Sequence, residues 1–168
     1  MLASHELMGF VSPALANEIL EYARESDKPT YKTVVAAVAQ ARHLRPVFLE
    51  RQERTQRHAT MLSMLSRPSL DVMAATLLRA WLVQKQKSML VDFLTSLGIE
   101  HKDGVVEGLP ATMEDEKLKV AVDLLLTKYP HEHVAVYLNA FNDMNEAHWD
   151  NLKAMLQSDA RLQLGATS

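Results

Sequence analysis

Apolar residues recur every three or four positions along most of this chain, and no other feature of the sequence limits its fold as strongly. The clearest example follows Ser12 and Pro13. Proline suits the first position of a helix, and the serine oxygen can accept a hydrogen bond from a free backbone N–H at the helix start. The apolar positions after them are Leu15, Ile19, Leu20 and Ala23. This arrangement predicts a helix that begins at Pro13 and buries one face.

Similar apolar stripes predict a series of further helices. They begin near Thr30, Pro46, Ser69, Met89, Thr112, Pro130 and Asn145. The helix from Pro46 is expected to run to about Ser66 without a break, and residues 47–49 are its apolar anchor at one end. Strands are scarcely needed, although Asp103-Gly104 in the connection 99–110 favours a short hairpin. The sequence therefore predicts an all-α fold, a helical bundle or short helical stack of about seven to eight helices.

Length and composition favour one globular domain. The 168 residues are 48% hydrophobic and 23% charged, which is ordinary for a folded protein. We predict a single all-α domain over 1–168, and leave open a division into a basic-centred part, 1–98, and an acidic part, 99–168. No apolar run is long enough to span a bilayer, and the N-terminus lacks the basic and apolar regions of a secretory signal. We therefore expect a cytoplasmic protein with no membrane contact, whose last residues, 159–168, form a frayed tail.

A weak internal similarity relates residues 69–104 to residues 116–151. At this offset of 47 positions, five of 36 pairs are identical, among them His101 with His148 and Asp103 with Asp150. Periods of this length occur in helical repeat proteins. So few identities are little above what two helices of similar composition share, so the sequence leaves open whether this is a duplication.

Residue patterns for catalysis or metal binding are weak in this chain. There is no cysteine, no glycine-rich phosphate loop and no nucleophile elbow. His131 and His133 lie about 200° apart on a helix and cannot chelate one ion together, and no histidine has His, Asp or Glu three or four residues away. A site assembled from distant helices, such as His131 with His148, stays open. We predict no catalytic residue, no metal and no cofactor, and Asp143, Glu146 and Asp150 are expected to form a solvated edge.

Charge is distributed unevenly along the sequence. Residues 28–88 contain eleven Lys and Arg against three acids, a net charge of +8. Residues 89–168 have a net charge of −7, and residues 1–27 a net charge of −4. Such asymmetry is typical of proteins that contact nucleic acid or a membrane surface. It is equally expected where basic and acidic parts face each other within one molecule or across a dimer.

The segment Glu50–His58 lacks any apolar side chain and lies in a block that contains arginine but no lysine. Arginine presents a planar fork that suits carboxylate or phosphate. In the predicted helix, arginines spaced by three residues form a row, and Glu50–Arg54 and Glu53–Arg57 are favourable ion pairs four residues apart. The predicted partner-binding residues are Arg42, Arg45, Arg51, Arg54, Arg57 and His58.

The function that this pattern favours is protein interaction or self-association. The arginine-rich helix face would bind an acidic surface on a protein partner or on a second copy of the chain. Nucleic-acid binding by the same helix is the alternative, although the block has no interleaved aromatic residues for stacking and contains acids of its own. A metal-dependent enzyme is favoured less.

Overall fold

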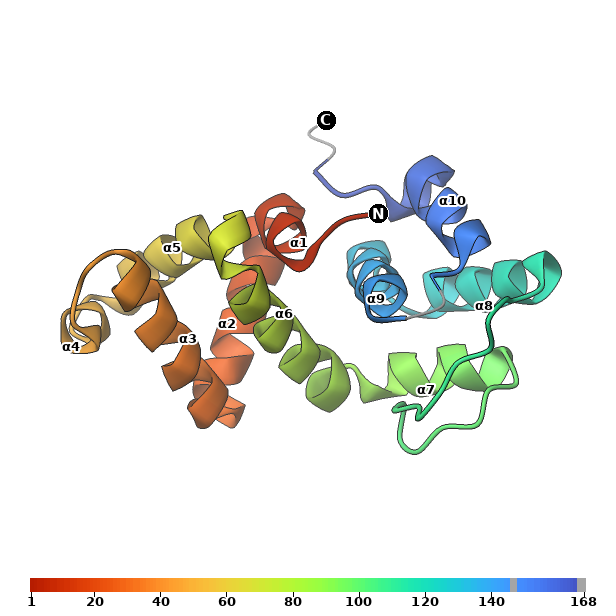
Figure 1. The fold of residues 1–168 in the computed structure, drawn as a ribbon, viewed down its shortest axis with the longest axis horizontal. Helices are drawn as coiled ribbons and strands as arrows, with labels where there is room; N and C mark the ends of the chain where they lie inside the picture. Colours follow the sequence, from red (N-terminus) through yellow and green to blue (C-terminus); the bar gives the residue numbers. More distant parts are fainter. Residues whose placement is uncertain (146–147, 166–168) are drawn as a thin grey trace. The chain divides into compact units, whose positions relative to one another are not determined.

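A computed structural model of the chain describes residues 1–145 and 148–165. Within this described part the protein is all-helical, as predicted, with ten α-helices instead of the seven to eight expected. The chain divides into two compact units (Figure 1). The N-terminal unit is Ala3–Trp81, and the C-terminal unit is Leu82–Ser168 together with Met1–Leu2. The boundary between these units falls after Trp81, and the division that the sequence analysis left open lay after residue 98.

The N-terminal unit consists of six α-helices and a short 3-10 turn, Pro68–Leu70. The helices are α1 (Ser4–Phe10), α2 (Pro13–Ser26), α3 (Lys28–Ala41), α4 (Pro46–Glu50), α5 (Arg54–Leu65) and α6 (Asp71–Ala80). Ser12 caps α2 as predicted, because its Oγ accepts a hydrogen bond from the Leu15 N–H. The core is built from fully buried apolar residues of every long helix, among them Ile19, Val38, Leu65 and Leu77.

The predicted unbroken helix from Pro46 to Ser66 is wrong. The helix α4 ends at Glu50 and α5 begins at Arg54. In one continuous helix, Leu49 and His58 would lie about 180° apart and could not both face the core. Both side chains are buried in the folded unit, so the chain turns between them. The break also removes the helical spacing on which the predicted Glu50–Arg54 pair depends. Glu53 keeps its spacing from Arg57, whose N–H bonds the Glu53 carbonyl oxygen, but the two side chains form no ion pair.

The C-terminal unit contains four α-helices around an aromatic core. They are α7 (Lys87–Ser96), α8 (Asp115–Lys128), α9 (His131–Met144) and α10 (Asp150–Ser158). A π-helical turn, Trp81–Lys85, precedes α7, and a 3-10 turn, Ala160–Leu162, follows α10. Phe93, Tyr137 and Phe141 contact one another edge to face, and Trp149 packs on Phe141 with 5.3 Å between ring centroids.

The end of the chain differs from the structure that the sequence predicts. The last helix was expected to begin near Asn145, but Asn145 directly follows the last residue of α9, Met144, and α10 begins at Asp150. The expected frayed tail is ordered in part, because residues 160–162 form a turn in which Leu162 is buried. Residues 166–168 of that tail, and Glu146 of the expected solvated edge, lie outside the described residues.

The connection between α7 and α8 contains the predicted hairpin. Lys102 and Val105 exchange both backbone hydrogen bonds. Asp103 and Gly104 between them have φ values of 54° and 84°, the pattern of a type I′ turn. A Cβ on Gly104 would lie 2.8 Å from the Leu90 Cβ, so glycine is required for the turn to pack against α7. No helix in the described part of the chain is both long and apolar enough to cross a membrane.

Candidate functional site

The six predicted partner-binding residues separate into two groups in the N-terminal unit. Arg42, Arg45 and Arg51 are exposed on α4 and the turns beside it. Arg54, Arg57 and His58 instead belong to α5 and contact groups of the same unit. The structure therefore does not form the single arginine row that the sequence analysis described.

Glu21 on α2 is the acidic residue that the second group faces. Its Oε1 lies 3.1 Å from the Arg54 Nε and 3.5 Å from the His58 Nδ1. Its Oε2 lies 3.0 Å from an Nη of Arg24 on the same helix. We call Glu21, Arg24, Tyr31, Arg54, Arg57 and His58 the Glu21 network. One carboxylate thus joins α2 to α5, and part of the arginine block is paired inside its own unit.

His58 is the most buried member of the network, with 3% of its surface exposed. Its Nε2 lies 2.8 Å from the Tyr31 hydroxyl, and its Nδ1 lies 3.4 Å from the Asn17 Oδ1. Because both Nδ1 neighbours, Asn17 and Glu21, present acceptor oxygens, the proton is assigned to Nδ1. The Tyr31 O–H then donates to Nε2. This tautomer satisfies both ring nitrogens of the neutral histidine.

The charges around His58 favour its neutral form. Burial lowers the pKa of His58 below its ordinary value of 6.5, and the Glu21 carboxylate opposes this by raising it. Arg57, Arg24 and Arg54 lower the pKa again, so the net direction is downward. Burial also raises the pKa of Tyr31 above its ordinary value, and Arg57 only partly offsets that rise. Both rings are therefore uncharged at neutral pH.

Arg57 connects this network to the end of α4. One Nη donates a 2.8 Å hydrogen bond to the Glu50 carbonyl oxygen, which lies in the last turn of α4, where carbonyl groups have no partner within the helix. The guanidinium carbon lies 5.9 Å from the centre of the Tyr31 ring, within the range of a cation–π contact. Among the described residues the buried Arg57 Nε has no hydrogen-bond partner. Arg57 therefore holds the turn at residues 51–53 against α3.

Residues 42–51 form an exposed projection that we call the basic cap. The helix α3 ends in a Schellman motif, in which the Leu44 N–H bonds the Ala39 carbonyl and the His43 N–H bonds the Gln40 carbonyl. His43 has a φ of 57°, a conformation that glycine usually provides at this position. The chain then enters α4 at Pro46. Every residue from 40 to 48 is exposed, and Leu49 is the buried anchor of α4.

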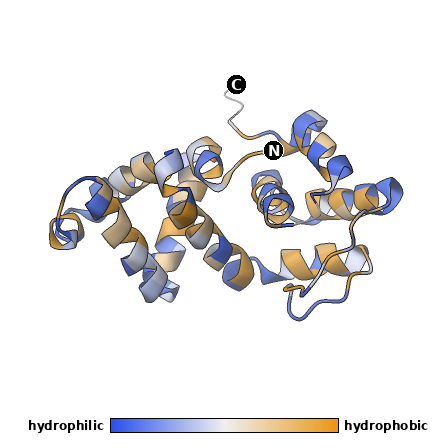
Figure 2. Ribbon diagram, viewed as in Figure 1, coloured by the Kyte–Doolittle hydropathy of each residue, from blue (hydrophilic) through white to orange (hydrophobic). Residues whose placement is uncertain are grey.

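The cap places apolar side chains among arginines. Phe48 is 56% exposed, Val47 39% and Leu44 38%. The sequence analysis expected residues 47–49 to be an apolar anchor, and this holds for Leu49 alone. No ion pair between described residues involves Arg42, Arg45 or Arg51, and Figure 2 shows hydrophobic and hydrophilic segments side by side at α4 and the preceding turn. Exposed aromatic residues next to arginine are enriched at the centres of protein interfaces.

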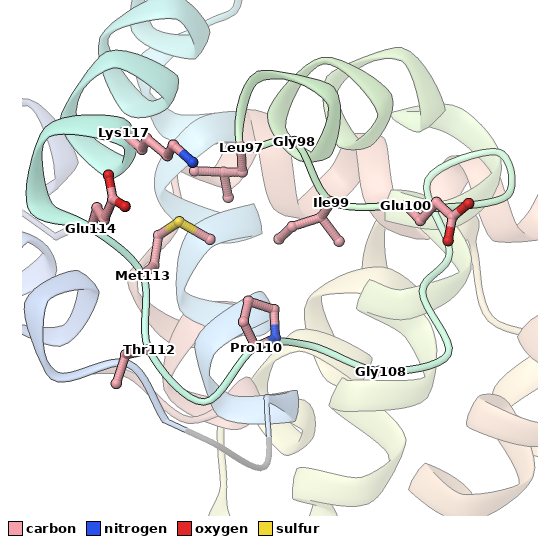
Figure 3. Close-up of a pocket in the computed structure, with 10 residues that line it drawn as sticks. All are labelled: Leu97, Gly98, Ile99, Glu100, Gly108, Pro110, Thr112, Met113, Glu114 and Lys117. Atoms are coloured by element: carbon pink, nitrogen blue, oxygen red, sulfur yellow. The ribbon is translucent and has the colours of Figure 1, made fainter.

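The C-terminal unit contains an open pocket of about 480 Å³ between the end of α7, the following connection and the start of α8. In Figure 3 the side chains of Leu97, Ile99, Pro110 and Met113 face its opening. The charged lining residues are Glu100, Glu114 and Lys117. The pocket wall at Pro110 is held by Trp149, whose indole N–H donates a 2.8 Å hydrogen bond to the Pro110 carbonyl. The pocket thus combines an apolar floor with a mainly acidic rim.

The histidines and acidic residues of the described part of the chain do not gather into a metal-binding cluster. No group of three or more His, Asp or Glu side chains there could hold an ion. His131 and His148, which the sequence left open as a distant pair, belong to no such group. His148 instead contacts the Asn142 carbonyl oxygen through its Nδ1.

The depressed pKa of His58 makes stability depend on pH in a defined direction. Between the pKa of the folded state and 6.5, the unfolded chain binds a proton that the folded chain does not. We therefore expect the free energy of unfolding to be highest above pH 6.5 and to fall below it, by up to about 1.4 kcal/mol per pH unit. Urea unfolding followed by circular dichroism between pH 7.5 and 5.5 measures this slope. A slope of opposite sign would contradict the assignment.

A variant without the imidazole separates this effect from other titrations. His58→Gln is expected to flatten the slope between pH 7.5 and 5.5. His43→Asn is the control, because it removes an exposed histidine and asparagine tolerates the positive φ. Equal slopes in wild type and His58→Gln would show that another group causes the dependence.

Several residues of these surfaces were missed by the sequence analysis. Glu21 and Tyr31 lie far from the arginine block in sequence, and nothing in their spacing relates them to it. Nothing in the sequence indicated that Phe48 is exposed, because three consecutive apolar residues predict a buried anchor. The pocket residues come from the connection between α7 and α8 and from the first turn of α8, and only the folded chain brings them together.

No protein-family model, no curated protein and no solved structure matches this chain.

Proposed function

We propose that this protein is a non-enzymatic interaction module whose basic cap binds an acidic, partly apolar surface of a protein partner. The observation that supports this most is the exposure of Phe48, Val47 and Leu44 among three arginines that form no ion pair with any described residue. Burial of a phenylalanine side chain contributes about 1.5–3 kcal/mol. The arginines would add orientation and a faster association with an acidic surface. Of the six residues that the sequence analysis predicted to bind a partner, Arg42, Arg45 and Arg51 would contact it in this proposal.

The support beneath the cap suits such a role. Leu49 anchors α4 in the core, and Arg57 fixes its C-terminal end through the Glu50 carbonyl. Binding elements held in one conformation lose less entropy on association than mobile ones. In this proposal Arg54, Arg57 and His58 position the cap and do not contact the partner themselves.

Nucleic-acid binding is the second candidate, and the three exposed arginines of the cap favour it. Arginine binds phosphate as readily as carboxylate. However, Phe48 is the cap's one aromatic residue, and α4 has five residues, too few to lie along a groove. A fluorescence-anisotropy titration with single-stranded and duplex nucleic acid at two salt concentrations tests this candidate. Steeply salt-dependent binding that Arg45→Glu abolishes would favour it over protein binding.

Selection from a random peptide-display library tests the proposed function. Peptides enriched on wild type are expected to combine Asp or Glu with Phe, Leu or Trp. The same peptides should bind Phe48→Ala and Arg45→Glu at least about tenfold more weakly, equal to about 1.4 kcal/mol. Val72→Ala is the matched control, because Val72 is 72% exposed on α6, outside the cap. Enriched peptides without acidic residues, or equal binding to Phe48→Ala, would contradict the proposal.

A further inference from the structure

We infer that the partner of the basic cap is a second copy of this chain, and that the cap docks in the pocket of that copy's C-terminal unit. This inference rests on the proposed function and names its partner. It follows from two surfaces of one chain that match each other in charge, in polarity and in size.

The charges of the two surfaces are opposite. The cap, residues 42–51, contains three arginines and one glutamate, a net charge of +2. The segment 97–117, which supplies all the pocket's lining residues, contains six acids and two lysines, a net charge of −4. Of these acids Glu100 and Glu114 line the pocket itself, and both are exposed. Opposite potentials of this kind orient two proteins as they meet.

The apolar groups also match. Phe48 projects from the cap with more than half of its surface exposed, and the pocket presents Ile99, Pro110 and Met113 beside the almost fully buried Leu97. The pocket volume of about 480 Å³ lies in the range of sites that enclose small organic groups. A phenylalanine ring fits that space with room for a neighbouring aliphatic side chain. Met113 adds a thioether, which makes favourable contacts with aromatic rings.

The two surfaces are different patches, so the contact is heterologous. The cap of one copy would fill the pocket of the next, and each copy would still have one free cap or one free pocket. Such an assembly grows with concentration instead of stopping at a symmetric dimer, unless it closes into a ring. Because the cap is small, the dissociation constant is expected on the order of 10–100 µM.

Complementation between two defective variants tests this contact. Phe48→Asp places a charge in the docking side chain, and Glu100→Lys with Glu114→Lys reverses the charge of the pocket rim at two exposed positions. By sedimentation equilibrium from 5 to about 500 µM, wild type is expected to gain mass with concentration. Each variant alone should stay at the mass of one chain. Their equimolar mixture should reach the mass of two chains, since one supplies an intact pocket and the other an intact cap.

Val72→Asp is the control variant for this test. It charges an exposed apolar side chain outside the cap and should associate as wild type does. Circular dichroism checks that every variant is folded. A wild type that keeps the mass of one chain throughout, or a mixture that fails to associate, overturns the inference. If acidic peptides still bind the cap in that case, the proposed function stands and only the second copy is rejected; if they do not, both are rejected.

Discussion

Replacing Trp149 with alanine is expected to lower the free energy of unfolding by about 3–5 kcal/mol. The side chain is 2% exposed and packs on Phe141 in the aromatic core of the C-terminal unit. The substitution opens a cavity there and also removes the donor to the Pro110 carbonyl. Because Pro110 lines the pocket, the variant should lose the pocket wall along with stability. Urea unfolding by circular dichroism measures the loss, and amide hydrogen exchange over residues 99–114 reports on the wall.

Trp149→Phe separates packing from the hydrogen bond. Phenylalanine keeps most of the apolar contact with Phe141 but has no N–H for Pro110. We expect a cost of about 1–2 kcal/mol, concentrated in faster exchange near Pro110. If the free energy of unfolding of Trp149→Ala lies within about 1 kcal/mol of the wild-type value, the indole does not organise this core.

Local patterns in the sequence predicted local structure well. The Ser12-Pro13 start of α2 and the Asp103-Gly104 hairpin were both expected, because each depends on a few adjacent residues whose backbone preferences are strong. The all-helical class followed from apolar spacing repeated over many turns. The number of helices could not be predicted from that spacing, because α1 is short and the break before α5 has no proline or glycine to mark it.

Distant contacts explain what the sequence could not show. The break between α4 and α5 depends on whether Leu49 and His58 can both reach the core, which is decided by helices α2 and α3. The burial of His58 similarly depends on Tyr31 and Glu21. The polar segment Glu50–His58 is therefore divided by the fold. Arg54, Arg57 and His58 contact groups of their own unit, whereas Arg51 is exposed.

Partner binding by the six predicted residues stays a prediction, and the single arginine row that was expected to provide it does not form. Arginine in place of lysine indicated recognition of an acidic group, and Arg54 does contact the carboxylate of Glu21 in its own unit. Arg42, Arg45 and Arg51, which form no ion pair within the described part of the chain, lie in the cap together with Phe48. The apolar periodicity of the sequence could not reveal that Phe48 is exposed, because exposed and buried apolar residues can have the same spacing.

Replacing Glu21 with alanine is expected to lower the free energy of unfolding by about 1–2 kcal/mol. Loss of one partner from a fully buried ion pair costs about 3–5 kcal/mol, but Glu21 is 22% exposed and its partners Arg54 and Arg24 are 56% and 29% exposed, so solvent screens most of that penalty. The variant leaves Arg24 and Arg54 beside each other without their shared carboxylate. It also removes the group that raises the pKa of His58, so that pKa should fall further. Urea unfolding at pH 7.5 and NMR titration of the imidazole measure the two effects.

Glu25→Ala is the matched control for this prediction. Glu25 also contacts Arg24, at 3.2 Å, but its side chain is 64% exposed and an exposed pair contributes at most about 1 kcal/mol. If the network supports the cap, Glu21→Ala should also weaken cap-dependent peptide binding, while Glu25→Ala leaves it unchanged. Peptide binding that survives in a folded Glu21→Ala protein would show that α4 keeps its position without the network, and that Leu49 alone is a sufficient anchor.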